Sequence, residues 1–162
     1  MLKHKLIEKR KTIFSPCRNY RYVLWREFDF TNPTYAMFIG LNPSTADETK
    51  DDPTIRRCIG FAKTWGLGAL CMTNLFAYRS TSPIKMKEHP YPIGPHNDKW
   101  LCELAIDASI IIAAWGTNGK HNNRAKRIIE MIPNLKCLDF TKDGSPRHPL
   151  YIWAGQKPIG FN

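Results

Sequence analysis

A continuous apolar segment, residues 35–41, runs into the sequence Gly40-Leu41-Asn42-Pro43-Ser44, and this combination constrains the fold more than any other feature. A strand that is apolar on both faces is typical of the centre of a parallel sheet. In an open α/β sheet, ligands bind just beyond the carboxyl ends of such strands. We therefore expect residues 35–41 to form a central strand, and the loop that follows to be part of a site.

The same strand-loop-helix pattern recurs along the chain, so the fold class that we predict is α/β. Further apolar strands are expected at residues 69–75, 109–115 and 135–140, with helices at 53–66, 95–106 and 124–132 between them. Asp52-Pro53-Thr54 is a strong helix start, with Asp as the N-cap and Pro at the first helical position. Alternation of this kind predicts a parallel sheet with helices on both faces.

We expect one domain over residues 1–162, built as a three-layer α/β/α sandwich with a four-stranded parallel core sheet. Residues 20–28 are rich in aromatic and β-branched side chains, which predicts an added N-terminal edge strand with one wet face. Residues 1–19 form a basic lead-in and residues 153–162 a short tail. Residues 77–93 contain three prolines and are expected to be a long loop, which in a compact domain is usually functional.

Charge and cysteine usage narrow the possible functions. Lys and Arg number 24 against 14 Asp and Glu, a net charge of +10, which favours a polyanionic partner, with DNA as the first choice. The five cysteines stand singly, without the paired spacing of a zinc site, an iron–sulfur cluster or a disulfide framework. No apolar run is long enough to span a bilayer, and the N-terminus does not read as a signal peptide. We expect a cytoplasmic monomer without cofactor or metal.

If the four strands are parallel, their carboxyl ends deliver four polar segments to one edge of the sheet. These segments are residues 40–44, 73–74, 115–118 and 141–148. Their convergence is the main indication of a site that the residues themselves provide. Phosphate-loop and dinucleotide-binding fingerprints are absent, as are a G-x-S-x-G elbow and an H-E-x-x-H helix. Nucleotide hydrolysis of the phosphate-loop kind, Rossmann redox chemistry, serine hydrolysis and zinc peptidase chemistry are therefore disfavoured.

Three of these segments resemble, in order and spacing, the motifs of the uracil-DNA glycosylase superfamily. Gly40-Leu41-Asn42-Pro43-Ser44 is similar to its first motif, and Thr73-Asn74-Leu75, followed by Arg79 and Pro83, to the strand whose Asn recognises the base edge. His148-Pro149-Leu150-Tyr151 resembles its second motif, a His-Pro followed by a loop that enters the duplex. The resemblance covers about residues 35–152. The whole chain also resembles a family of uncharacterised bacterial and phage proteins, a domain of unknown function.

The resemblance implies a DNA glycosylase-like hydrolase that cleaves the N-glycosidic bond of a damaged or modified base. Asn42 would place the water and His148 would stabilise the departing base anion, while Asn74 offers a donor and an acceptor to a pyrimidine edge. The first motif lacks a carboxylate of its own, so Asp47, in the acidic stretch that follows, is the candidate to activate the water. The enzyme must flip its base out of the stack, and Leu150 or Tyr151 would fill the gap.

The remaining candidate residues fall into two groups. The substrate-binding group also takes in backbone and apolar residues beside the motifs and two aromatic platforms: Gly40, Leu41, Pro43, Ser44, Phe61, Phe76 and Pro149. The nucleic-acid-binding group consists of cations near the expected site: Arg56, Arg57, Arg79, Lys142 and Arg147.

Plainer interpretations stay open for several of these residues. Asn42 before proline is also a common turn residue, Asn74 can cap a strand end, and a lone His148 is often structural. Phe61 fits core packing, and the acidic stretch fits a solvated loop with an N-cap. Two other functions also stay open: a nucleic-acid or modified-base binding protein without catalysis, and hydrolysis or transfer on free nucleosides or nucleotides.

Overall fold

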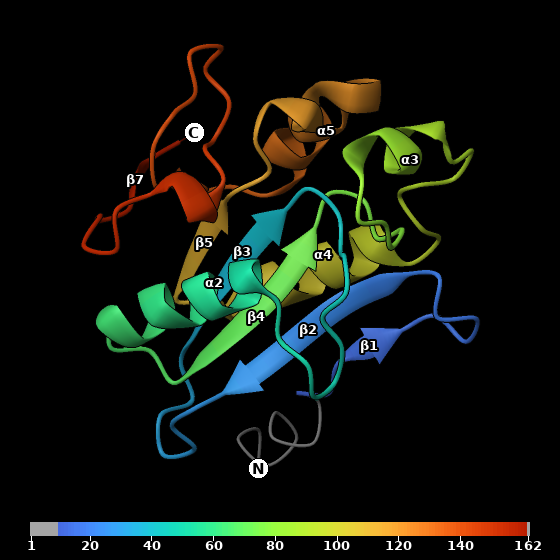
Figure 1. The fold of residues 1–162 in the computed structure, drawn as a ribbon. Helices are drawn as coiled ribbons and strands as arrows, with labels where there is room; N and C mark the ends of the chain where they lie inside the picture. Colours follow the sequence, from blue (N-terminus) through green and yellow to red (C-terminus); the bar gives the residue numbers. More distant parts are fainter. Residues whose placement is uncertain (1–9, 162) are drawn as a thin grey trace.

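The computed structural model describes residues 10–161 and contains one mixed sheet of seven strands in the order β1-β2-β4-β3-β5-β6-β7 (Figure 1). The strands are β1 (Ile13–Phe14), β2 (Arg21–Glu27), β3 (Tyr35–Gly40), β4 (Ala69–Asn74), β5 (Ile110–Ala113), β6 (Lys136–Cys137) and β7 (Ile159–Gly160). The helices are α2 (Pro53–Thr64), α3 (Pro83–Glu88), α4 (Asn97–Asp107) and α5 (Arg124–Met131). Short 3-10 helices are η1 (Thr117–Asn123) and η2 (Pro149–Tyr151). Much of the predicted basic lead-in, residues 1–9, lies outside the described residues.

The centre of the sheet consists of β4, β3, β5 and β6, which pair in parallel as the sequence predicts. All residues of β3 and β4 are buried, which explains why both strands are apolar on both faces. Gly40 pairs with Asn74, and Ile39 with Ala113, so the three central strands end at nearly the same level. Their arrowheads point to the same side of the molecule in Figure 1.

Helices cover both faces of the sheet. Residues of α2 pack with Leu24, Phe38 and Ile112 on one face. Side chains of α3, α4 and α5 pack with Met37, Ile39 and other residues on the opposite face. Figure 1 shows α2 in front of the sheet and α4 behind it. In the described part of the chain, no helix has the length and apolar character needed to cross a membrane.

The strand at residues 20–28 differs from the prediction of an edge strand with one wet face. β2 lies inside the sheet, antiparallel to β4, because the unpredicted strand β1 pairs along its outer side. Residues 21–25 are buried on both faces. Arg26 donates to the carbonyl oxygens of Asp47 and Lys50 and forms an ion pair with Asp51, so the acidic loop is tied to the end of β2.

Two other segments also differ from their predictions. The long loop at residues 77–93 contains the helix α3, which begins after Ser82 with its hydroxyl accepting from the Lys85 amide and Pro83 at the first turn. The tail at residues 153–162 returns to the sheet as β7, which pairs with β6. Phe161 packs edge-on against Trp115 with ring centroids 5.8 Å apart, so the C-terminal segment supports the end of β5.

Candidate active site

A cavity of about 770 Å³ opens at the carboxyl end of the parallel strands. All four polar strand ends predicted to converge contribute to its lining, together with the start of α2 and the segment from Arg147 to Tyr151. Pockets that enclose small ligands commonly have volumes of about 300–1,000 Å³. The cavity therefore has room for more than a single planar base.

Asn74 forms part of the wall as the last residue of β4, and the residue is 2% exposed. Its Nδ2 has no hydrogen-bond partner among residues 10–161, so this buried donor is available to an acceptor on a ligand. The opposite atom, Oδ1, lies against Gly40, where an added Cβ would come within 2.8 Å of it. The glycine of the first motif is thus required because the Asn74 amide occupies the space that a side chain would take.

The backbone that carries Asn74 is held from behind by α4 and α5. Asn97 donates through Nδ2 to the carbonyl oxygens of Asn74 and Leu75, at 2.9 and 3.0 Å. Arg124, also buried, donates through Nε to the Leu75 carbonyl and through Nη2 to Asp98 at 2.5 Å. These bonds fix the exit of β4 and with it the direction of the Asn74 side chain.

Asn42 lines the cavity from the loop after β3. Its Nδ2 donates to the carbonyl oxygens of Ser80 and Pro43, at 2.9 and 3.2 Å. Both amide hydrogens are therefore used within the protein, and the carbonyl Oδ1 is the atom left to accept a hydrogen bond. That oxygen suits a water molecule as a partner.

His148 reaches the cavity from the start of η2, in contact with the ring of Tyr151. Its Nδ1 accepts from the backbone amide of Leu150 at 3.2 Å, so in the neutral ring Nε2 carries the proton. Partial burial lowers the pKa of His148, although the negative charge of Asp52 works in the opposite direction. A neutral imidazole that offers an N–H donor results.

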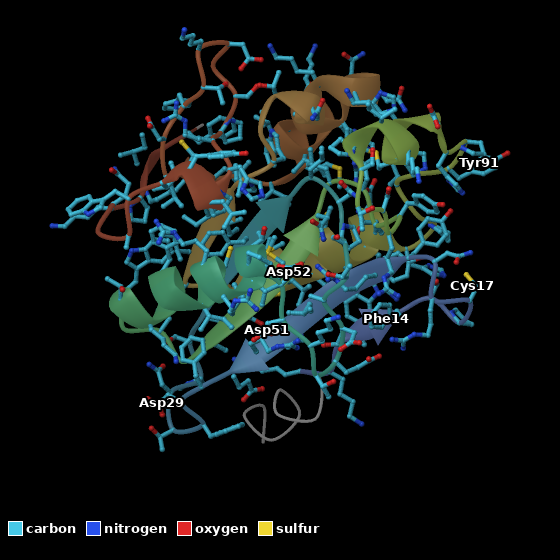
Figure 2. The ribbon with its side chains drawn as sticks, in the orientation of Figure 1. Phe14, Cys17, Asp29, Asp51, Asp52 and Tyr91 are labelled. Atoms are coloured by element: carbon cyan, nitrogen blue, oxygen red, sulfur yellow. The ribbon has the colours of Figure 1, made fainter. Side chains whose placement is uncertain are left out.

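Asp47 does not line the cavity, contrary to its predicted role. Its Oδ1 accepts from the amides of Thr49 and Lys50, at 2.9 and 2.7 Å, and these bonds hold its pKa below the usual value. Among the described residues, Asp52, labelled in Figure 2, is the carboxylate that lines the cavity instead. One oxygen accepts from the Ile55 amide at 2.8 Å as the N-cap of α2, and Oδ2 has no hydrogen bond among the described residues.

Neither predicted aromatic platform belongs to the cavity. Phe61 is buried between Phe38 and Trp65, and Phe76 is buried beside His121 in the opposite core. An apolar residue near a motif is not marked by the sequence as core or site, which is why both predictions failed. Trp115, two residues beyond β5, is an aromatic residue that does line the cavity. Gly119 packs so tightly on it that an added Cβ would collide with the indole ring.

The predicted cations are spread around the cavity and not gathered in it. Arg147 lines it and pairs with Asp139 at 3.2 Å, whereas Lys142 is exposed outside. Arg57 points to a separate depression and donates to the carbonyl of Ile152, which ties α2 to the segment after η2. Arg56 borders the same depression, and Arg79 lies in a shallow groove beside the cavity. Leu150 and Tyr151, at the rim, are 46% and 77% exposed.

Comparison with known proteins gives one match, over residues 21–150, to the family described as protein of unknown function DUF1643. The chain belongs to the DUF1643 family. No curated protein and no solved structure matches it. The DUF1643 region runs from the first residue of β2 to η2, so it contains every residue that lines the cavity except Tyr151. The sequence predicts membership of an uncharacterised family, and this prediction is confirmed.

Arg21, the first residue of the DUF1643 region, is a cavity residue that the sequence does not single out. The predicted edge strand has one wet face, but Arg21 is 2% exposed. β2 runs antiparallel to β4, so its first residue lies where β4 ends. The sequence shows Arg21 next to the apolar run at residues 22–25, but β2 also contains Arg26 and Glu27, so an arginine alone did not mark the site. The structure contains no cluster of three or more His, Cys, Asp or Glu side chains suited to a metal among residues 10–161.

Proposed function

We propose that this protein is a DNA glycosylase-like hydrolase that cleaves the N-glycosidic bond of a modified pyrimidine, on a three-layer α/β/α fold of the uracil-DNA glycosylase type. One observation carries the proposal. Asn42, Asn74 and His148 come from three segments far apart in the sequence, and all three line one cavity. Each has the atom free that the reaction needs: an acceptor on Asn42, a donor on Asn74 and a ring N–H on His148.

The proposed reaction begins with a water molecule that donates a hydrogen bond to Oδ1 of Asn42. Its oxygen attacks C1′ of the sugar while the bond from C1′ to the base nitrogen breaks, and the electron pair leaves with the base. The Nε2–H of His148 stabilises the anion that forms, as preorganised donors do where charge develops. Asp52 takes the proton that the water loses, through the Oδ2 atom that the helix cap does not use.

The remaining residues bind the substrate in this proposal. Asn74 reads the pyrimidine edge with an amide that Asn97 and Arg124 hold in place through the backbone. Base flipping costs a few kcal/mol, which Leu150 and Tyr151 offset when they fill the vacated space. Both residues project from the cavity rim with much of their surface exposed, as residues that enter a duplex must.

Oligonucleotides that contain uracil or modified pyrimidines, single-stranded and duplex, test the proposal. After incubation and hot alkali, strand breaks at the modified position report base release. We expect Asn42→Ala and His148→Gln to lower the rate at least a hundredfold. Asp52→Asn should lower it as well, and Asp29→Asn is the matched control, because Asp29 lies at the far end of the sheet (Figure 2).

Two results would overturn the proposal. Tight binding of the oligonucleotides without abasic product would leave a base-binding protein, the non-catalytic alternative. Base release that survives both Asn42→Ala and His148→Gln would place the chemistry elsewhere.

A further inference from the structure

The buried guanidinium of Arg21 has no role in the reaction proposed above. Its Nη1 donates to the carbonyl oxygen of Ala46 at 2.9 Å, but Nε has no partner among the described residues. No carboxylate within residues 10–161 forms an ion pair with it, and Asp52 acts on it only as a nearby charge. A buried charge without a partner is expensive, so Arg21 is a candidate to bind a ligand of opposite charge.

Burial lowers the pKa of Arg21 to about 10, so the side chain keeps its positive charge at neutral pH. Arg147 adds a second positive charge to the lining, and Asp52 is the one carboxylate that residues 10–161 contribute to it. Arg147 already has Asp139 as a partner, whereas Arg21 has no such partner among the described residues. Arg21 is therefore the cation in the cavity that is available to an anionic ligand.

The cavity that Arg21 lines also has hydroxyl side chains in its wall. Ser44, Ser80 and Thr81 line the cavity and also line the adjoining groove, whose other residues include Arg18 and Arg79. The Ser80 hydroxyl is engaged by Ser82, but the hydroxyls of Ser44 and Thr81 form no hydrogen bond within the described part of the chain. Free hydroxyl donors in the same cavity lining as the Arg21 guanidinium, with Arg79 in the adjoining groove, match the oxygens of a phosphate better than the edge of a base.

We propose that Arg21, with Ser44 and Thr81, forms a phosphate subsite, so that the cavity takes a whole nucleotide unit and not a base alone. This inference rests on the proposed function, because it takes the base to lie at Asn74. The size of the cavity agrees with it, since about 770 Å³ exceeds what one base fills. In this arrangement the nucleic-acid strand continues from that phosphate along the adjoining groove, where Arg18 and Arg79 lie.

Calorimetric titration with 2′-deoxyuridine and its 5′-monophosphate tests the subsite without any reaction. We expect the monophosphate to bind the wild type at least tenfold more tightly than the nucleoside. Arg21→Gln should bring that ratio close to one, and Arg21→Lys should give an intermediate value, because lysine keeps the charge but loses the planar fork. Arg127→Gln, on the exposed face of α5, is the matched control and should leave the ratio unchanged.

Several outcomes overturn the subsite. It falls if the wild type binds neither compound or both equally, or if Arg21→Gln weakens both to the same extent, which would assign Arg21 to the base. If Arg21→Gln fails to fold, Arg21→Lys and the rise in the wild-type melting temperature with inorganic phosphate decide the matter. If neither the wild type nor any variant releases base, while the binding ratio still depends on Arg21, the subsite stands and the glycosylase proposal fails. If base is released and Arg21→Gln has the same KM as the wild type, the glycosylase proposal stands and the subsite fails.

Discussion

At the scale of single residues, Gly40 shows that a glycine in a motif can be needed for the space that it leaves to a neighbouring side chain, and not for its own backbone conformation. A methyl group here would meet both Oδ1 of Asn74 and the Cε atom of Met72, at 2.8 and 2.9 Å. We expect Gly40→Ala to push the Asn74 amide aside and to weaken nucleoside binding at least tenfold, as calorimetry would show. Gly60→Ala is the control, since its Cβ meets nothing and alanine stabilises a helix interior by about 1 kcal/mol. Equal nucleoside affinity in both variants would contradict this interpretation.

The environment of His148 leads to a prediction about how the stability of the protein depends on pH. Its pKa is lowered in the folded protein, so between that value and its usual pKa of about 6.5 the unfolded chain binds more protons. The stability that the neutral ring contributes is therefore fully present above about pH 6.5 and is lost as the pH falls through the lowered pKa. Urea unfolding at pH 5 to 8 should show a smaller acid loss for His148→Gln than for wild type. An identical loss in the two proteins would rule out His148 as its source.

At the scale of secondary-structure elements, the sequence predicts what is periodic and misses what is short or depends on pairing. Apolar runs locate β3, β4 and β5 because buried parallel strands need them, and from these the convergence of the loop ends follows. β1 and β7 have two residues each, too few for a pattern, so the burial of β2 and the position of Arg21 could not be foreseen. Asp52 lines the cavity and Asp47 does not, because Asp47 is engaged by hydrogen bonds within its own loop. The spacing of residues along the sequence does not reveal such bonds.

The bonds from α4 and α5 to the end of β4 give a prediction for these elements. Arg124→Met removes the donor to the Leu75 carbonyl and the partner of Asp98. Losing charge-assisted hydrogen bonds of this kind should lower the free energy of unfolding by about 2 kcal/mol, as measured with urea. Arg127→Met, on the exposed side of the same helix, should change it by less than about 0.5 kcal/mol. If the two variants lose the same stability, the network does not hold the strand end.

At the scale of the whole molecule, a net charge of +10 predicts how binding to nucleic acid responds to salt. Each phosphate that a cation neutralises releases counterions, so the logarithm of the binding constant falls with the logarithm of salt concentration, at about 0.9 per contact on duplex DNA. We expect a steep slope for the wild type. Arg79→Gln, in the groove beside the cavity, should reduce it by about 1, whereas Arg127→Gln should not.

Fluorescence anisotropy of labelled oligonucleotides across a salt series measures these slopes. The comparison separates local from overall charge, because both substitutions remove one positive charge from the molecule. If Arg79→Gln and Arg127→Gln reduce the slope equally, DNA responds to the net charge alone. A reduction confined to Arg79→Gln would mean that the DNA strand crosses the groove lined by Arg18 and Arg79. This groove adjoins the cavity that Arg21 lines.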